Sequence, residues 1–125
     1  MILGSGVDLS EVPRIRAAME RYGERFKNRV FTAREIAYSE RKANPYERYA
    51  ARFAAKEAGM KALGTGWRGG LGWRDLEVAN LQSGRPTLHF HGKAAEIAER
   101  LGVRHIALSL THTAEQAMAM VILES

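Results

Sequence analysis

The chain has 125 residues, of which 46% are hydrophobic, and it carries a formal net charge of +5. That length predicts a single domain over residues 1–125, and no stretch approaches the roughly 18 apolar residues of a membrane-spanning helix. Cysteine is absent, which excludes disulfides, thiolate metal sites and a cysteine nucleophile and is typical of a cytoplasmic protein. The first residues also lack the basic and apolar segments of a signal peptide.

Positive charge is concentrated in the first half of the chain. Residues 1–61 hold 13 Lys and Arg against 8 Asp and Glu, whereas residues 62–125 hold 6 of each. A surface that is basic on one side favours an acidic partner, which can be nucleic acid, an anionic membrane, an acidic protein or a phosphorylated ligand.

The N-terminal segment predicts a strand followed by a basic helix. Residues 2–7 are apolar with two glycines and predict a buried strand that ends at Asp8. Ser10 is the expected N-cap of the helix, and Gly23 ends or kinks it. Apolar residues recur at helical spacing on one face and arginines occupy the other: Ile15, Met19, Tyr22 and Phe26 against Arg14, Arg16, Arg21 and Arg25.

The middle of the chain predicts two further helices and a loop. Thr32 and Glu35 match a capping box, so a helix is expected from Ala33. A long helix is expected over residues 46–63, with Gly64 as its stop. Residues 64–74 contain five glycines and two tryptophans, which indicates an irregular loop.

The C-terminal part predicts four strands and one helix. Strands are expected over residues 75–80, 87–91, 104–111 and 117–123, with a helix over residues 93–101 between the second and third. The full order is then βαααββαββ, an α+β fold class with an antiparallel sheet and packed helices in one domain.

Two carboxylates can be interpreted as ligands of a hard metal ion. Asp8 follows a strand, where it can point into a cleft, but it can equally be a first-turn acid of the next helix. Glu57 lies on the side of the long helix that also carries Phe53 and Met60. The alternative for Glu57 is a solvated pair with Lys61, four residues later.

The same helix and the turn after it carry groups that suit phosphate. Lys56 and Lys61 offer ammonium groups, and the Gly64-Thr65-Gly66 turn offers amides and a hydroxyl. The pattern is not a Walker A motif, because the turn follows a helix instead of preceding one. Gly64 can also be an ordinary helix C-cap.

Histidines add one candidate. His112 ends an apolar strand beside Ser109 and Thr111, so it can contact a ligand or act as an acid or base, or simply be exposed at a turn. His89 and His91 share a strand face, but a zinc site is disfavoured because no third ligand is evident.

Taken together, these segments resemble the holo-[acyl-carrier-protein] synthases (AcpS), the small bacterial phosphopantetheinyl transferases. The resemblance is collinear over nearly the whole chain and fits the short AcpS type. Its most specific part is the pairing of a G-x-D signature with F-x-x-K-E-A. The segments that carry it are Gly6-Val7-Asp8, Phe31-Thr32 with Glu35, Arg52 to Ala58, Lys61 to Gly66, Gly84-Arg85-Pro86 and Ser109 to His112. Thr111 departs from it, since serine is expected there more often.

The resemblance implies the 4′-phosphopantetheinyl transferase fold and a Mg²⁺-dependent transfer of 4′-phosphopantetheine from coenzyme A to a serine of apo-acyl carrier protein, a step in fatty acid biosynthesis. Asp8 and Glu57 match the Mg²⁺ ligands of the family. Glu57 is the first candidate for the general base and Lys61 the second. The residues that map onto the coenzyme A pocket are Arg52, Phe53, Lys61, Gly64, Thr65, Gly66, Pro86, Ser109 and His112.

The resemblance also implies partners. Members of the family dock the strongly acidic acyl carrier protein on the basic first helix, where Arg14, Arg21 and Arg25 are the best candidates, with Met19 or Phe26 as apolar contacts. They are typically homotrimers with active sites between subunits, and they need neither a membrane nor nucleic acid.

Two other functions fit parts of the sequence. A basic module that binds RNA or DNA would use the arginine helix, but it leaves the two carboxylates and the glycine turn unexplained. A Mg²⁺-dependent hydrolase of coenzyme A or another pyrophosphate would use the same carboxylates without a carrier protein.

Overall fold

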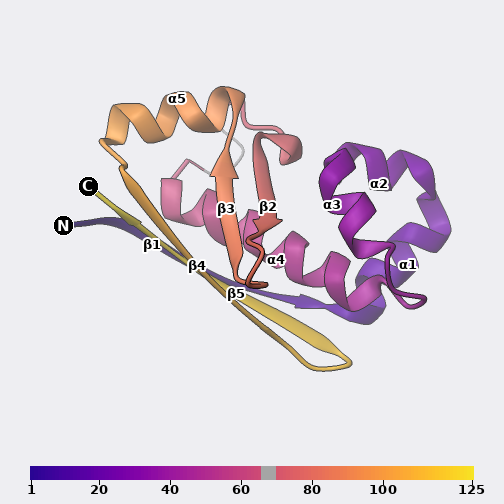
Figure 1. The fold of residues 1–125 in the computed structure, drawn as a ribbon. Coiled ribbons are helices and arrows are strands. Elements are labelled where there is room, and N and C mark those ends of the chain that lie inside the picture. The colour runs from indigo at the N-terminus through magenta and orange to yellow at the C-terminus, as the bar shows by residue number, and fades with distance from the viewer. Residues whose placement is uncertain (66–69) are drawn as a thin grey trace.

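The computed structural model describes residues 1–65 and 70–125, which form an α+β arrangement with antiparallel sheets (Figure 1). The elements in chain order are β1 (Ile2–Glu11), α1 (Val12–Tyr22), α2 (Glu24–Val30), α3 (Ala33–Ser39), α4 (Tyr46–Leu63), the 3-10 turn η1 (Trp73–Asp75), β2 (Leu76–Asn80), β3 (Pro86–Phe90), α5 (Gly92–Leu101), β4 (His105–His112) and β5 (Gln116–Glu124). The predicted fold class is confirmed. Among the described residues, no helix is long and apolar enough to cross a membrane.

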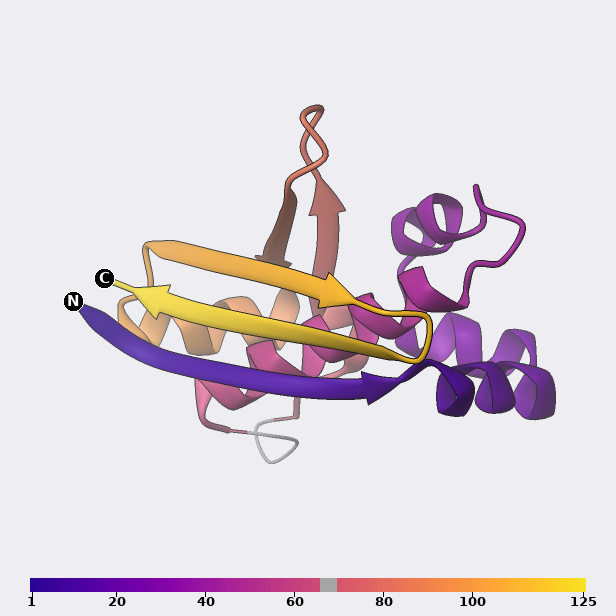
Figure 2. The ribbon, with the colours of Figure 1, turned by 90° about the horizontal axis from the view of Figure 1, so that it is seen from below.

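Helix α4 lies between two antiparallel sheets. The larger sheet has the strand order β1-β5-β4, and the smaller one is the hairpin of β2 and β3. Figure 2 shows α4 behind the larger sheet, with α1, α2 and α3 gathered beyond one end of it. The two termini lie together at the other end, where the Ser125 N–H donates to the Met1 carbonyl at 3.0 Å.

The contact between β1 and α4 depends on two glycines. A Cβ built on Gly4 would lie 2.1 Å from the carbonyl oxygen of Ala62, and one built on Gly6 would lie 2.0 Å from that of Ala58. Any side chain at either position would push the strand away from the helix. Residues two apart share a strand face, so Asp8 continues this row and is held beside α4.

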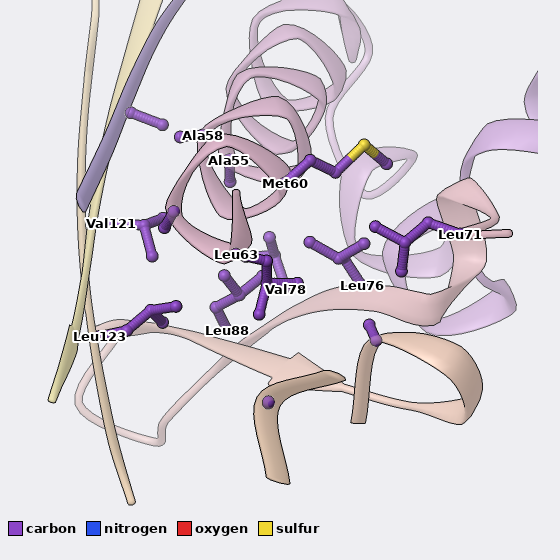
Figure 3. Packing of buried hydrophobic residues seen from close by; sticks show 14 of the residues in the cluster. Ala55, Ala58, Met60, Leu63, Leu71, Leu76, Val78, Leu88, Val121 and Leu123 are labelled. Atoms are coloured by element: carbon purple, nitrogen blue, oxygen red, sulfur yellow. The ribbon is translucent and has the colours of Figure 1, made fainter. Parts of the chain in front are cut away.

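Two hydrophobic clusters are built around α4. One cluster fills the space between its C-terminal half, the hairpin and β5, as Figure 3 shows for Met60, Leu63, Leu76, Val78, Leu88, Val121 and Leu123. The other joins its N-terminal half to α1 and α2 through Val12, Ile15, Val30, Phe31 and Tyr49. The helix is therefore buried on most sides, which suits its many alanines.

Local sequence signals were accurate at most helix ends. Helix α4 covers residues 46–63 as predicted and ends at Gly64, which has a φ of 79°. Thr32 and Glu35 form the predicted capping box at the start of α3. Gly23 does end α1, but a separate helix α2 follows it, so the predicted order βαααββαββ lacks one helix.

Two expectations for the first strand were wrong. Strand β1 continues to Glu11 because its pairing with β5 extends to Gln116, so Ser10 is a buried strand residue and not an N-cap. The strand is also not buried on both faces. Val7 and Leu9 are 54% and 51% exposed, because only the row of Gly4, Gly6 and Asp8 faces α4.

Candidate functional site

Three of the predicted site residues meet where β1 passes α4. The Lys61 Nζ lies 2.9 Å from Asp8 Oδ1 and also donates to the Val7 carbonyl at 3.1 Å. Glu57 lies one helical turn before Lys61, which places both side chains on the same face of α4. The structure thus brings Asp8, Glu57 and Lys61 together at one place, which we call the cleft.

The charges in this cleft do not fully compensate one another. Burial raises the pKa of Glu57, and the neighbouring Asp8 raises it further, while Lys61 and Arg14 act in the opposite direction. The hydrogen bond to Asp8 raises the pKa of Lys61, so that lysine stays protonated at neutral pH. Two close carboxylates with only partial compensation favour an added cation.

The donor set fits Mg²⁺ when a substrate supplies the remaining ligands. Mg²⁺ is commonly held by one or two carboxylates together with waters and phosphate oxygens. In the part of the chain that the structure describes, no group of three or more His, Asp or Glu side chains could hold a metal ion by itself. Asp8 and Glu57 can therefore supply a partial coordination shell, which a phosphorylated ligand would complete.

A cavity of about 350 Å³ opens beside Glu57. Its walls come from β1, α1, α2 and α4 and include Leu9, Arg14, Phe26 and Phe53. Two residues predicted to contact a partner protein, Arg14 and Phe26, thus share a cavity with the predicted metal ligand Glu57. The cavity joins an apolar wall to a carboxylate and a guanidinium.

The basic face of α1 lies next to this cavity. Arg14 and Arg21 on α1 and Arg25 on α2 are exposed, so they are available to an acidic surface. Met19 is only 8% exposed and packs in the core, which leaves it little surface for a partner. The Met19 side chain points inward because it lies on the same side of α1 as Ile15, and that side faces the core.

Arg52 and Pro86 lie at a different place from the Asp8 cleft. Arg52 is 3% exposed, and its guanidinium lies 3.9 Å from the centre of the Tyr38 ring and donates to Asn80. It lines a second cavity, of about 480 Å³, together with Arg34 and Arg41. Pro86 pairs with Asn80 across the hairpin, at the edge of that cavity.

The predicted residues of β4 are also separated. Ser109 is paired with the exposed Met120, whereas His112 is paired with the buried Ala117, so the two side chains lie on opposite faces of the strand. The His112 Nδ1 lies 2.9 Å from Glu47 Oε1 at the start of α4. Glu47 precedes Glu57 by ten residues, about 15 Å along the helix axis, so one chain does not bring His112 to the cleft.

The turn after α4 is described only in part. The Gly64 N–H donates to the carbonyls of Met60 and Lys61, as expected of a C-cap. Thr65 Oγ1 is buried and has no hydrogen-bond partner among the described residues. Gly66, a predicted coenzyme A contact, lies outside the described residues.

Lys56 does not belong to the cleft, although the sequence suggested that it could bind phosphate. Its side chain is fully buried and forms an ion pair of 2.7 Å with Glu35 Oε1. Sequence reasoning also missed Tyr38 and Trp73, which pack on Arg52 and Phe53. No local signal marks them, because their partners are distant in the chain. His91, for which no role was predicted, lies 3.0 Å from Glu77.

Comparisons with known proteins identify the family of the chain. A profile of the 4′-phosphopantetheinyl transferase superfamily matches residues 4–121. A holo-[acyl-carrier-protein] synthase of Solibacter usitatus is 66% identical over 125 residues, which is 100% of both chains. The crystal structure of the Neisseria meningitidis holo-[acyl-carrier-protein] synthase superposes with a TM-score of 0.91 at 30% identity and covers 100% of both chains.

A second solved structure comes from Bacillus anthracis. This holo-(acyl-carrier-protein) synthase, in complex with CoA (3′,5′-ADP), gives a TM-score of 0.81 at 34% identity and covers 100% of this chain and 98% of its own. The chain therefore belongs to the 4′-phosphopantetheinyl transferase superfamily and, within it, to the enzymes known as holo-[acyl-carrier-protein] synthases. The resemblance indicated by the sequence motifs is confirmed.

Proposed function

We propose that this chain transfers 4′-phosphopantetheine from coenzyme A to a serine of apo-acyl carrier protein and releases adenosine 3′,5′-bisphosphate. The observation that carries the proposal is the cleft in which Asp8, Glu57 and Lys61 meet beside a cavity that also contains Arg14. Carboxylates for a metal, a lysine for phosphate and an arginine for an acidic partner are what this reaction requires. The names of the relatives and the CoA-bound neighbour support it.

The proposal includes Mg²⁺ held by Asp8 and Glu57. When bound, the metal would offset negative charge on the pyrophosphate of coenzyme A. Lys61, which is protonated because its pKa is raised, would contact the phosphate that carries the pantetheine arm. The exchange of Lys61 from Asp8 to that phosphate requires only a side-chain rotation, because the lysine is largely exposed.

In the transfer step, the serine oxygen of the carrier protein attacks the phosphorus that bears the pantetheine arm. The bond from that phosphorus to the bridging oxygen breaks, and the bisphosphate leaves with the electron pair. Glu57 is the first candidate to take the serine proton, directly or through a metal-bound water, and Lys61 is the second, because the raised pKa of Lys61 keeps it protonated at neutral pH. The proton then leaves to solvent.

We further propose that a second copy of the chain completes the coenzyme A site and that the assembly is a homotrimer. The predicted coenzyme A residues Arg52, Pro86, Ser109 and His112 lie away from the Asp8 cleft of their own chain. The outer face of the larger sheet exposes a row of apolar side chains that suits a contact between copies: Leu3, Val7, Leu9, Met118 and Met120. Sedimentation equilibrium with a Val7→Lys variant tests this, and a monomeric wild-type chain would contradict it.

The acyl carrier protein is proposed to dock on the basic face beside the cavity. Arg14, Arg21 and Arg25 would meet acidic side chains of the carrier, and Phe26 would add an apolar contact. This arrangement would bring the carrier's serine to the cavity next to Glu57.

The experiment is intact-protein mass spectrometry of an apo-acyl carrier protein incubated with this protein, coenzyme A and Mg²⁺, with EDTA in a parallel tube. A gain of one phosphopantetheine group that EDTA abolishes is the expected result. If the mass does not change although a known synthase modifies the same carrier, the proposal is wrong. Breakdown of free coenzyme A in that tube would then identify a hydrolase, and its persistence would favour a binding module.

A further inference from the structure

Lys56 is the charged residue of the F-x-x-K-E-A signature that the proposed reaction does not use. It is fully buried, and its ammonium group contacts three acceptors: Glu35 Oε1 at 2.7 Å, the Leu76 carbonyl at 2.6 Å and the Trp73 carbonyl at 3.1 Å. A buried ammonium with three acceptors has the full number of partners that it can use. Such a group is costly to bury, which raises the question of what its position achieves.

The partner carboxylate is equally enclosed. Glu35 is also fully buried, and it accepts hydrogen bonds from the Thr32 N–H at 2.8 Å and the Val78 N–H at 2.7 Å. The ion pair therefore ties three separate segments together, namely the start of α3, the middle of α4 and the stretch from η1 into β2. Buried polar networks of this kind fix one arrangement of the elements they join.

One of these contacts leads to the proposed active site. Trp73, whose carbonyl is held by Lys56, stacks its ring on Phe53 with centroids 4.8 Å apart and planes at 26°. Phe53 in turn lines the cavity that Glu57 lines. An unbroken chain of contacts therefore runs from the buried ion pair, through the main chain and ring of Trp73, to the wall of the cavity beside Glu57.

We propose that Lys56 and Trp73 are positioning residues: the Lys56–Glu35 ion pair fixes the η1 turn, and Trp73 holds the Phe53 ring in place beside Glu57. This inference rests on the proposed function, because it assigns the cleft wall to the binding of coenzyme A. Loss of either residue would leave the Phe53 ring free to change rotamer and enter or leave the cavity. The affinity for coenzyme A would fall, while Asp8 stays where Gly4 and Gly6 hold β1 against α4.

The first arm of the test uses the fluorescence of Trp73. The chain has two tryptophans, so a Trp67→Phe background leaves Trp73 as the reporter. In this background the double variant Lys56→Met with Glu35→Gln removes both buried charges together and avoids an unpaired one. We expect its Trp73 emission to shift to the red and its quenching by acrylamide to increase. Lys61→Met, which alters a largely exposed lysine, is the matched control and should change neither quantity.

The second arm measures the kinetics of transfer. Trp73→Ala should raise the KM for coenzyme A about tenfold, a size typical of the coupling between contacting residues, with kcat within about twofold. Trp73→Phe keeps a ring against Phe53 and should restore the KM. If Trp73 acts through Phe53, the double variant Trp73→Ala with Phe53→Ala should be no worse than Phe53→Ala alone.

A core variant separates positioning from simple destabilisation. Leu88 is 4% exposed and packs in the cluster between α4 and the hairpin, so Leu88→Ala should destabilise the fold while leaving the KM unchanged. Additive losses in the Trp73 and Phe53 double variant, or an unchanged emission in the charge-deleted variant, would overturn the proposal. Failure of the proposed function itself would be seen separately, as absence of transfer by the wild-type chain.

Discussion

Two charged regions lie on neighbouring faces of α4 and differ in how completely their charges are matched. Lys56 and Glu35 are fully buried, and together their charged groups have hydrogen-bond partners on every side. Asp8, Glu57 and Lys61 lie in an open cleft, where two carboxylates share one lysine and the pKa of Glu57 is raised. Lys56 and Glu57 are adjacent in sequence, yet they belong to different regions.

Both regions carry charge, so charge alone does not indicate a binding site. What differs is whether every charged group already has its hydrogen-bond and ion-pair partners. A buried pair that is fully satisfied has nothing left to offer a ligand, so it holds the fold. A pair of carboxylates that repel each other has free energy to gain from a cation or a proton. We therefore expect a ligand to lower the free energy at the cleft and not at the buried pair.

The largest expected effect comes from breaking the buried pair on one side. Lys56→Met would leave the Glu35 carboxylate buried without its cation and should lower the free energy of unfolding by about 3–5 kcal/mol. Lys61→Met removes the lysine of the open cleft and should cost about 1 kcal/mol or less. Urea denaturation followed by circular dichroism measures both, and equal losses would erase the distinction between the regions.

For activity, in contrast to stability, we expect the larger losses from substitutions in the cleft. Asp8→Asn and Glu57→Gln should each lower transfer by more than about 100-fold, because the proposed cation site loses one of its two carboxylates. Their circular dichroism spectra should match that of the wild type. Near-normal transfer in the presence of Mg²⁺ by either variant would remove that residue from the metal site. Mass spectrometry of the carrier protein provides the measurement.

The distance between the strand and the helix links the two regions. Gly6→Ala would place a Cβ 2.0 Å from the Ala58 carbonyl oxygen, so β1 must move away from α4 and carry Asp8 with it. We expect a loss of about 1–3 kcal/mol in unfolding free energy, together with a lower Mg²⁺ affinity in calorimetric titration in the presence of coenzyme A. Ser5→Ala, on the opposite face of the same strand, is the matched control and should change neither value.

Charge reversal on the basic face should affect the two substrates, acyl carrier protein and coenzyme A, to different extents. Arg14→Glu combined with Arg21→Glu should raise the KM for the acyl carrier protein about tenfold or more, because two attractive contacts become repulsive. The KM for coenzyme A should rise far less. Steady-state kinetics with each substrate varied in turn gives both constants, and similar increases in the two would count against docking on α1.

The smallest expected effect is on the free energy of unfolding, which the ionised Glu57 carboxylate lowers. The folded state raises the pKa of Glu57, so its ionised form opposes folding above that pKa, and protonation relieves this cost as the pH falls. Glu57→Gln should therefore increase the free energy of unfolding at pH 7, on the order of 0.5 kcal/mol. The gain should vanish below the ordinary glutamate pKa of 4.5. A Glu57→Gln variant that is less stable than wild type at pH 7 would show that the cleft carries no such cost.

Most secondary structure could be predicted because its signals are local. Pro45 and Gly64 bound α4, and Thr32 with Glu35 starts α3, since caps and breakers act within one turn of the chain. The break at Gly23 was seen, but the separate helix after it was not. The extension of β1 past Asp8 was also missed, because strand length depends on a pairing partner more than a hundred residues later.

Part of the candidate site could also be predicted from the sequence. The row of Gly4, Gly6 and Asp8 and the helical spacing of Glu57 and Lys61 place three functional groups together once β1 packs on α4. The residues predicted to bind coenzyme A could not be placed in the same way. Arg52 and His112 contact Tyr38 and Glu47, and nothing in the sequence indicates these contacts between distant segments.

By itself, then, the sequence determined the family and the fold class and predicted the residues proposed to carry chemistry, because these depend on residue types at fixed spacing. Only the tertiary structure decided that Lys56 points into the core while Glu57 points into the cleft. Adjacent helical residues differ in direction by about 100°, and which direction is buried depends on where α3, the hairpin and β1 pack. That packing comes from contacts between segments far apart in the chain, which no local pattern records.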